Sequence, residues 1–369
     1  MISVSGLRSI YVLFDRVSDR LDFFYDKITC YYKERFTSPF IVNLLYISLF
    51  FLLTIIAGLR KPGIDRDWFG YEQMIKSITA SPDFWLRSHE LSFSVIVNFA
   101  DKVLNNPVTG TFLIYAILGV GIKLYAIRTY SRMQLFSIFI YISIFFVLFD
   151  MTGIRAGVAS SICLLAIKDI AEKKTVPFIL KAGVAFFFHY SAVVMIPLYF
   201  LSNRKPLKAL YLFLPVAAII AGYYNLGSVL LENIKHIFPA IIESKITGYL
   251  SLSDGLKIFA PYFISKMMIL YYCLFFLDSF KGKYDYLEIK IFAWAVIILY
   301  MFSPSGAIAS RIFDFFGLIQ IFLFPSIVIA SKRKAVMLFL FICYLLMTFY
   351  HQLFIQKLLN FGVIFSYSS

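Results

Sequence analysis

The sequence predicts an all-α fold, a polytopic transmembrane helical bundle, and three observations lead to it. Sixty per cent of the 369 residues are hydrophobic, only 15% are charged, and the mean hydropathy is +0.81. A soluble domain of this length needs far more polar surface to cover its core. The hydrophobic residues also form long runs instead of short alternating segments, which argues against a transmembrane β-barrel.

Most of these runs approach the roughly 20 residues that a helix needs to cross the hydrocarbon core. They are Phe40–Leu59, Val108–Ile127, Leu135–Phe149, Leu207–Gly222, Ala260–Leu277, Ile289–Phe302, Arg311–Ala330 and Val336–Phe354. With the apolar helix at Ala156–Ile170, they predict roughly nine full spans. Residues 40–369 are therefore expected to form a single transmembrane domain, with outer loops at 60–90 and 225–259.

Residues 1–39 precede the first span and carry a helical pattern of their own. Apolar residues recur at helical spacing between Leu7 and Ile28, among charged residues such as Arg8 and Asp19. This pattern predicts an amphipathic arm on the cytoplasmic membrane face, with no apparent removable signal peptide. The net charge of +14 is attributed to lysine and arginine in cytoplasmic loops, and no nucleic-acid partner is expected.

Two further segments are predicted to enter the membrane without crossing it. Val176–Leu201 is apolar, yet basic residues flank both of its ends: Lys173, Lys174, Arg204, Lys205 and Lys208. Since positive residues favour the cytoplasm, both ends should lie inside, and the segment should form a hairpin that turns at Phe188-His189-Tyr190-Ser191. Leu91–Leu104 is short and polar enough to be a re-entrant or half-length helix. Irregular backbone at membrane depth is tolerated only where it lines a cavity, so a cavity is expected.

This topology sorts the charged segments into two groups. Arg128 and Arg132 fall inside, with the basic residues around Lys174, Lys205, Lys281–Lys290 and Ser331–Lys334. The bend at Asp150–Arg155, the hairpin tip and the turn before Arg311 fall outside. A topology in which every segment crosses fully would instead place Arg128 and Arg132 outside and Arg155 inside, against the charge rule.

The first outer loop carries the acidic candidates. Asp65, Asp67 and Tyr71 lie in it, and His89-Glu90 ends it at the start of the short helix. A solvated loop without chemistry is the alternative interpretation.

Arg155 and Arg311 each open an apolar span on the predicted outer side. Arg155 has no acidic residue in the following turns, and its charge adds to the positive end of the helix dipole, so an anion site is expected there. The alternative for Arg155 is snorkelling to lipid headgroups. The alternative for Arg311 is a structural pair with Asp314.

His189 interrupts an apolar run at the predicted hairpin tip, beside Tyr190 and Ser191. A functional histidine and a core histidine bonded to a neighbouring carbonyl are both open interpretations. The sequence contains no glycine-rich phosphate loop, no metal-spaced His/Cys set and no serine nucleophile elbow. Cytoplasmic nucleotide hydrolysis is therefore not expected, and no metal or cofactor is predicted.

Four stretches together resemble the EpsG-like branch of the Wzy polysaccharide polymerases. They are Gly63-Ile64-Asp65 with Tyr71, His89-Glu90, Gly153-Ile154-Arg155-Ala156-Gly157-Val158-Ala159, and Phe188-His189-Tyr190-Ser191-Ala192. The stretches are spread over about half of the chain. The sequence departs from the usual forms of the family, Gly-Thr-Asp-Tyr and Arg-Gln-Gly, at Asp65-Arg66-Asp67 and Arg155-Ala156-Gly157.

The resemblance implies a metal-independent glycosyltransferase of the bacterial inner membrane with its active site facing the periplasm. Such enzymes transfer a growing glycan from undecaprenyl pyrophosphate to the next lipid-linked repeat unit of an O-antigen, capsule or exopolysaccharide. The implied partners are these lipid-linked oligosaccharides, membrane lipid, and a chain-length regulator and flippase of the same pathway.

The candidate residues suit this reaction. Arginine grips phosphate oxygens in a planar fork, and Arg155 and Arg311 are placed for the pyrophosphate. The acceptor hydroxyl needs a general base, either His189 or one of the three carboxylates at Asp65, Asp67 and Glu90. The remaining substrate-binding candidates are His89, Tyr71 and Tyr190.

Two other functions stay open from the sequence. A polysaccharide or lipid-linked oligosaccharide flippase is the main alternative, although the internal repeats common in transporters are not evident. A membrane O-acyltransferase would also place histidine and arginine near the end of a span.

Overall fold

The computed structural model describes residues 18–22, 38–81, 90–237, 240–251 and 255–365. Within these residues the named elements are all helices, and the prediction of an all-α fold is confirmed. Outside the helices, one isolated backbone bridge joins Asp65 to Leu359. Of the N-terminal arm only a short helical piece at 18–22 is described, so the predicted amphipathic helix lies outside the described residues.

Four helices are long and apolar enough to cross a membrane. The first two are α2 (Pro39–Gly58) and α6 (Pro107–Tyr130). The third is α7 (Gln134–Ile140), which continues as the π-helix η2 (Tyr141–Thr152). The fourth is α17 (Lys334–Tyr350), which continues as the π-helix η6 (His351–Ile355). Each of the four contains most of one predicted span.

Two further predicted spans each lie within a bent helix pair, and the partner helix of the first lies in the predicted outer loop 225–259. α10 (Lys208–Tyr223) meets α11 (Leu226–Ile234) and η4 (Lys235–Ile237) at 76°, with Asn225 in the left-handed conformation at the bend. α15 (Gly306–Gly317) meets α16 (Gln320–Ala330) at 60°. Counting each pair as one span gives up to six spans by length and composition.

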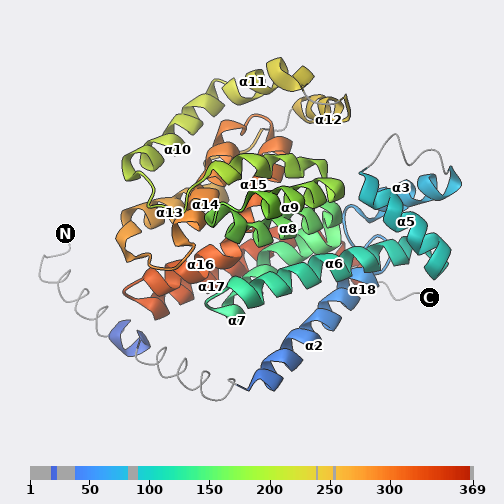
Figure 1. Ribbon diagram of the computed structural model, residues 1–369, viewed down its shortest axis with the longest axis horizontal. Helices are drawn as coiled ribbons and strands as arrows, with labels where there is room; N and C mark the ends of the chain where they lie inside the picture. The colour runs from blue at the N-terminus through green and yellow to red at the C-terminus, as the bar shows by residue number, and fades with distance from the viewer. Residues whose placement is uncertain (1–17, 23–37, 82–89, 238–239, 252–254, 366–369) are drawn as a thin grey trace, which may run out of the picture.

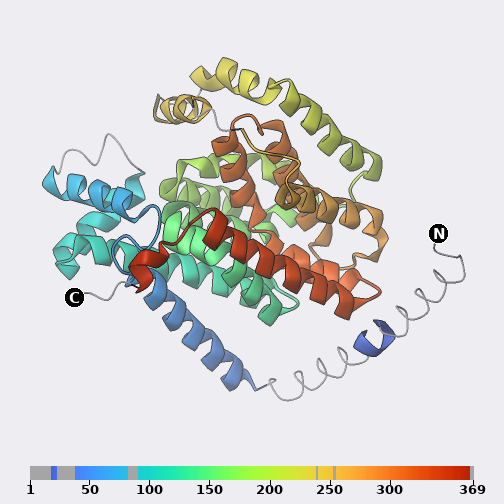
Figure 2. The same ribbon diagram turned by 180° about the vertical axis from the view of Figure 1, so that it is seen from behind.

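The expected nine full spans are not confirmed, because the remaining apolar runs form shorter or more deeply covered helices. They are α8 (Ile154–Ala171), α13 (Pro261–Phe275) and α14 (Asp285–Met301). Most residues of α8 and α14 are buried against other helices of the chain. Figures 1 and 2 show α8 and α14 within the bundle, whereas α2 and α10 lie at its edges. Hydropathy alone does not separate burial in protein from burial in lipid.

The predicted hairpin between residues 176 and 201 is present. It consists of α9 (Thr175–Phe188) and the 3₁₀ helix η3 (Tyr190–Phe200), with His189 between them. Lys173 closes its base, because its Nζ donates to the carbonyl oxygens of Tyr199 at 2.6 Å and Leu201 at 2.7 Å. The predicted half-length helix is α5 (Leu91–Leu104), 14 residues long and followed by Asn105 in the left-handed conformation.

The structure brings the residues predicted to lie inside to one end of the bundle. Arg132 Nη2 lies 2.6 Å from Asp285 Oδ1, and Glu172 lies within 3.1 Å of both Lys174 and Lys283. These contacts join the ends of four different helices. The grouping agrees with the topology that contains two half-crossings.

Both predicted outer loops contain helices. The first includes α3 (Trp68–Ala80), and the second includes α11, η4 and α12 (Ala240–Leu250). Figure 1 shows α3, α5 and α18 (Phe361–Phe365) gathered at one end of the bundle, with α12 above them. The first loop is joined there to the C-terminal segment, since Arg66 N donates to Leu358 O at 3.1 Å and Asn360 N to Ile64 O at 2.7 Å.

Candidate functional site

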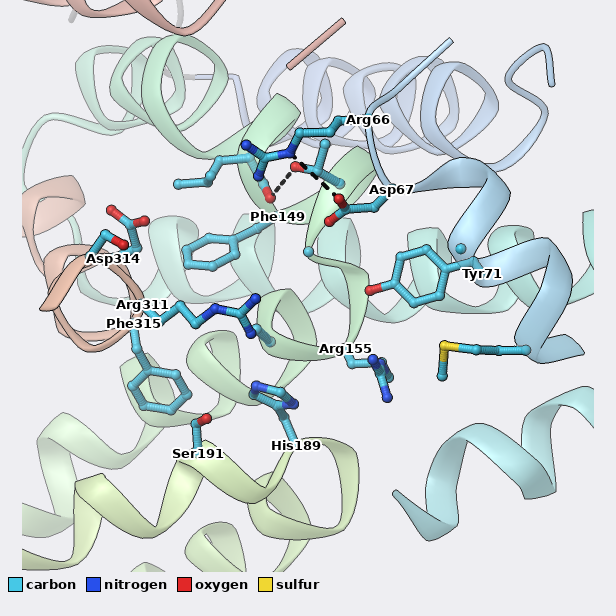
Figure 3. A pocket seen from close by; sticks show the side chains of 17 residues that line it. Arg66, Asp67, Tyr71, Phe149, Arg155, His189, Ser191, Arg311, Asp314 and Phe315 are labelled. Atoms are coloured by element: carbon cyan, nitrogen blue, oxygen red, sulfur yellow. Dashed lines mark hydrogen bonds and ion pairs between the residues drawn. The ribbon is translucent and has the colours of Figure 1, made fainter. Parts of the chain in front are cut away.

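A cavity of about 480 Å³ opens at this end of the bundle, between α3, α8, the hairpin tip and α15. Its wall includes five of the nine residues selected from the sequence: Asp67, Tyr71, Arg155, His189 and Arg311. Figure 3 shows the side chains of Arg155, His189 and Arg311 around the cavity, each from a different element. Because these elements are far apart in the sequence, the fold itself assembles the site.

Arg155 reaches the cavity because α8 packs closely against η2. Gly157, one turn after Gly153, faces the η2 backbone, and a Cβ there would lie 2.5 Å from the carbonyl oxygen of Phe149. Only glycine therefore fits at this approach. The contact sets the first turn of α8 beside the end of η2, where the Arg155 side chain is 18% exposed.

Glu90 connects the basic groups behind this wall. It is the N-cap residue of α5, and its side chain is fully buried. Its Oε2 accepts a hydrogen bond from Arg155 Nη1, while its Oε1 lies 2.7 Å from Lys245 Nζ and 3.1 Å from His189 Nδ1. Arg155 therefore has a carboxylate partner, although no acidic residue lies in the turns that follow it. Its partner Glu90 lies 65 residues earlier in the chain, so the spacing of residues along one helix does not predict the contact.

Arg155 still has an unused donor. Its Nε is buried and has no hydrogen-bond partner among the described residues. The guanidinium also lies 5.5 Å from the ring centroid of Tyr71 and 5.3 Å from that of Phe93. Arg155 is thus held by Glu90 and two aromatic rings while part of it lines the cavity.

The protonation of Glu90 follows from its three neighbours. Burial by itself raises the pKa of a carboxyl group. Here the hydrogen bond from His189 and the charges of Arg155 and Lys245 outweigh burial and hold the pKa of Glu90 below its usual 4.5. Glu90 is therefore a carboxylate that accepts hydrogen bonds at neutral pH.

His189 is oriented by its position between the two helices of the hairpin. Its backbone is extended, with φ −156° and ψ 123°, and its N–H donates to Ala185 O at 2.9 Å. A neutral imidazole that donates from Nδ1 to Glu90 keeps a lone pair on Nε2. His189 lines the cavity, so this second nitrogen is the one available to a bound molecule.

Arg311 lies on the opposite side of the cavity, in the middle of α15 instead of at the start of a span. Its guanidinium donates to the hydroxyl of Tyr249 on α12 and stacks 4.4 Å from the centroid of that ring. The proposed structural pair with Asp314 is not among the ion pairs of the described chain. Asp314 instead lines the same cavity.

Asp65 and Asp67 have different surroundings. Asp65 Oδ2 lies 2.6 Å from Arg60 Nε, and neither side chain is exposed. Arg60 also donates to the carbonyl oxygens of Ala57 and Met151. Asp65 is therefore enclosed in the scaffold and does not line the cavity, contrary to the expectation for a base. Asp67 does line it, and its backbone N–H donates to Asp65 Oδ1 at 3.1 Å.

Two of the nine selected residues, Tyr190 and His89, have not yet been placed. Tyr190 lies outside the cavity wall, with its ring centroid 4.7 Å from Lys245 Nζ. His89 lies outside the described residues. The sequence interpretation missed Arg66, Lys245 and Asp314 as members of the site. Arg66 and Lys245 lie in charged outer segments where solvent exposure is the ordinary expectation, so no sequence signal distinguishes them.

In the described part of the chain no three His, Cys, Asp or Glu side chains gather as metal ligands would, and the prediction of a metal-independent reaction stays a prediction. Neither the curated proteins nor the solved structures gave a match. The model of the EpsG family matches residues 43–369, which is nearly the whole chain and includes every residue of the cavity. The chain belongs to the EpsG family.

Proposed function

We propose that the protein is a polysaccharide polymerase. It transfers a glycan from undecaprenyl pyrophosphate to a lipid-linked repeat unit at the periplasmic face of the bacterial inner membrane. Membership of the EpsG family supports the class of a membrane protein of polysaccharide biosynthesis. The observation that carries the proposal is the cavity that combines the Glu90–His189 contact with two arginines, Arg155 and Arg311.

In the proposed reaction His189 is the general base. Glu90 fixes the imidazole through Nδ1 and stabilises the imidazolium that forms, as carboxylates do in catalytic triads. Glu90 itself is a poor base for a sugar hydroxyl, because its neighbours lower its pKa. The acceptor hydroxyl loses its proton to His189 Nε2 while its oxygen bonds to the anomeric carbon of the donor glycan.

The leaving group is the lipid pyrophosphate. The bond between the anomeric carbon and the pyrophosphate oxygen breaks, and the electron pair leaves with that oxygen. Arg155 and Arg311 stabilise the developing negative charge, a role in which preorganised cationic donors contribute strongly to rate. Arg155 suits it because Glu90 and Tyr71 hold its guanidinium in place before the substrate binds.

Asp67 and Tyr71 then serve as substrate-binding groups. Both line the cavity and can bond sugar hydroxyls, Asp67 as an acceptor and Tyr71 as donor or acceptor. Asp65 positions Asp67 from behind. Neither Asp67 nor Tyr71 is needed for proton transfer in this assignment.

The glycan of a deletion strain tests the proposed class of function. A strain that lacks the protein should accumulate single repeat units on their carrier at the periplasmic face, and the restored gene should return long polymer. Absence of exported repeat units in the deletion strain would indicate a flippase, and polymer of normal length without acyl groups would indicate an O-acyltransferase. Either result contradicts the proposal.

The proposed orientation has its own test. In intact cells an impermeant thiol reagent should not label a Lys174→Cys variant, whereas Ser251→Cys, in the second outer loop, should be labelled. Labelling of Lys174→Cys alone would place the cavity on the cytoplasmic side and overturn the orientation.

A further inference from the structure

A second cavity of about 580 Å³ adjoins the first, and Arg66 lines both. The second cavity lies between the first outer loop and the chain after α17, and its wall includes Phe69, Phe354, Lys357 and Phe361. Figure 3 shows Arg66 and Asp67 at the edge of the first cavity, joined by an ion pair at 3.5 Å. Arg66 therefore stands at the boundary between the two cavities.

Backbone contacts join the two segments that form the second cavity. The loop and the C-terminal segment are joined by the bridge between Asp65 and Leu359 and by the hydrogen bond from Asn360 N to Ile64 O at 2.7 Å. Gly63 has φ +72°, and a Cβ there would lie 2.9 Å from the ring of Phe69. Glycine thus lets the loop turn and brings Phe69 into the wall.

The charge of this cavity is positive. Its acidic residue, Asp65, is already paired with Arg60 in the buried scaffold. Arg66 keeps only its exposed pair with Asp67 at 3.5 Å, and no ion pair of Lys357 is found among the described residues. The cavity therefore presents two cations and the amide of Asn360 to a ligand, which is suitable chemistry for a phosphate group.

The apolar wall is continuous with the surface of a membrane helix. The ring of Phe354 stacks on Phe361 at 5.1 Å on one side and on Tyr350 at 4.8 Å on the other. Tyr350 and Phe354 are 58% and 52% exposed on α17 and its π-helical end, one of the four candidate spans. An isoprenoid chain in the bilayer can follow this row of rings up to the two cations.

The proposed reaction requires such a site. The acceptor has two chemically different ends, since its reacting hydroxyl is at the non-reducing end and its own lipid pyrophosphate is at the other. The hydroxyl must reach His189 in the first cavity, where Arg155 and Arg311 hold the pyrophosphate of the donor. The pyrophosphate of the acceptor must therefore lie one repeat unit away, at separate cations.

We infer that the second cavity binds the prenyl pyrophosphate of the acceptor, with Lys357 and Arg66 at the phosphates and Phe354 along the first isoprene units. This assignment rests on the proposed function and deepens it. It gives the enzyme two lipid sites, one for each substrate, with the sugars meeting at Arg66 and Asp67.

Binding of undecaprenyl phosphate to the purified protein, counted by native mass spectrometry, tests the inference without turnover. The wild type should hold two molecules, and excess phosphatidylglycerol should displace neither. Lys357→Met and Phe354→Ala should each weaken one of the two binding events by about tenfold or more, the loss of one charge-assisted contact or one packed ring. Arg155→Ala should weaken the other event and leave this one intact.

Matched controls are Lys76→Met, an exposed lysine on α3, and Leu346→Ala, an exposed position on α17. Both should bind two molecules like the wild type. A single binding event in the wild type, unchanged binding in Lys357→Met and Phe354→Ala, or equal displacement by phosphatidylglycerol would each overturn the inference. A wild type that binds two molecules but forms no polymer would instead contradict the proposed function, so the two failures are distinguishable.

Discussion

Replacing Glu90 by glutamine is expected to destabilise the protein more than any other single loss of charge at the site. Its carboxylate is fully buried and is shared by Arg155, His189 and Lys245. Removing one partner of a buried ion pair leaves the other charge uncompensated and typically costs about 3–5 kcal/mol. Glutamine keeps the size of the side chain, so the loss reflects charge and not a cavity.

Two further variants isolate the electrostatic part of this cost. In Glu72→Gln the lost pair is the exposed contact with Lys76 at 2.8 Å on α3, where such pairs contribute about 0.3–0.5 kcal/mol. In the double variant Glu90→Gln with Arg155→Met the uncompensated guanidinium is absent. The double variant should therefore unfold at a higher temperature than Glu90→Gln alone, although it carries one more substitution.

The assay is the unfolding temperature of the purified variants in one detergent at one pH. The expected order, from most to least stable, is the wild type together with Glu72→Gln, then the double variant, then Glu90→Gln. Two results would contradict this assignment: an unfolding temperature of Glu90→Gln equal to that of Glu72→Gln, or a double variant that is the least stable of the four. Either would show that Glu90 is not the counter-ion of a buried Arg155.

Three other predictions concern single positions. Arg155→Lys should lose nearly as much polymer as Arg155→Ala at matched protein levels, because an ammonium cannot bond two pyrophosphate oxygens in a planar fork; near-normal chain length on a gel would support snorkelling instead. Asp67→Asn should lower polymer yield while the protein keeps its unfolding temperature. Asp65→Asn should lower the unfolding temperature, because it breaks a fully buried ion pair. The reverse pattern would exchange the roles of the two aspartates. Lys245→Met should move the acidic limb of the pH–activity profile to higher pH, because it removes a positive charge that disfavours protonation of His189. An unmoved limb would show that Lys245 does not act on the base.

Some features of the site were predictable because they violate the apolar pattern of a membrane helix. Arg155 and His189 interrupt apolar runs, and charge parity placed both at one end of the bundle. The structure brings them to one cavity. The hairpin was predictable for the same reason, since lysines at both of its ends require both ends to lie on one side, and Lys173 indeed closes it.

Other features depend on packing between distant segments. The contact of Glu90 with Arg155 spans 65 residues, and that of Glu90 with Lys245 spans 155. No local pattern predicts either contact. The count of nine spans is not confirmed, and α14 shows why hydropathy alone does not give the number: most of its residues are buried within the protein, and Asp285 and Glu288 lie in its first turn. Asp65 was selected because its charge is visible in the sequence, whereas no sequence pattern shows that it is buried with Arg60.

The central claim is that His189, held by Glu90, takes the proton of the acceptor hydroxyl. It is tested most directly by the purified protein in liposomes with its lipid-linked repeat unit. The wild type should form a ladder of lipid-linked polymer and release one undecaprenyl pyrophosphate for each bond formed. His189→Ala should form bonds about 10²–10⁴-fold more slowly, the usual contribution of a general base, while its retention of undecaprenyl phosphate is unchanged. A His189→Gln variant that forms the ladder at the wild-type rate would contradict the claim.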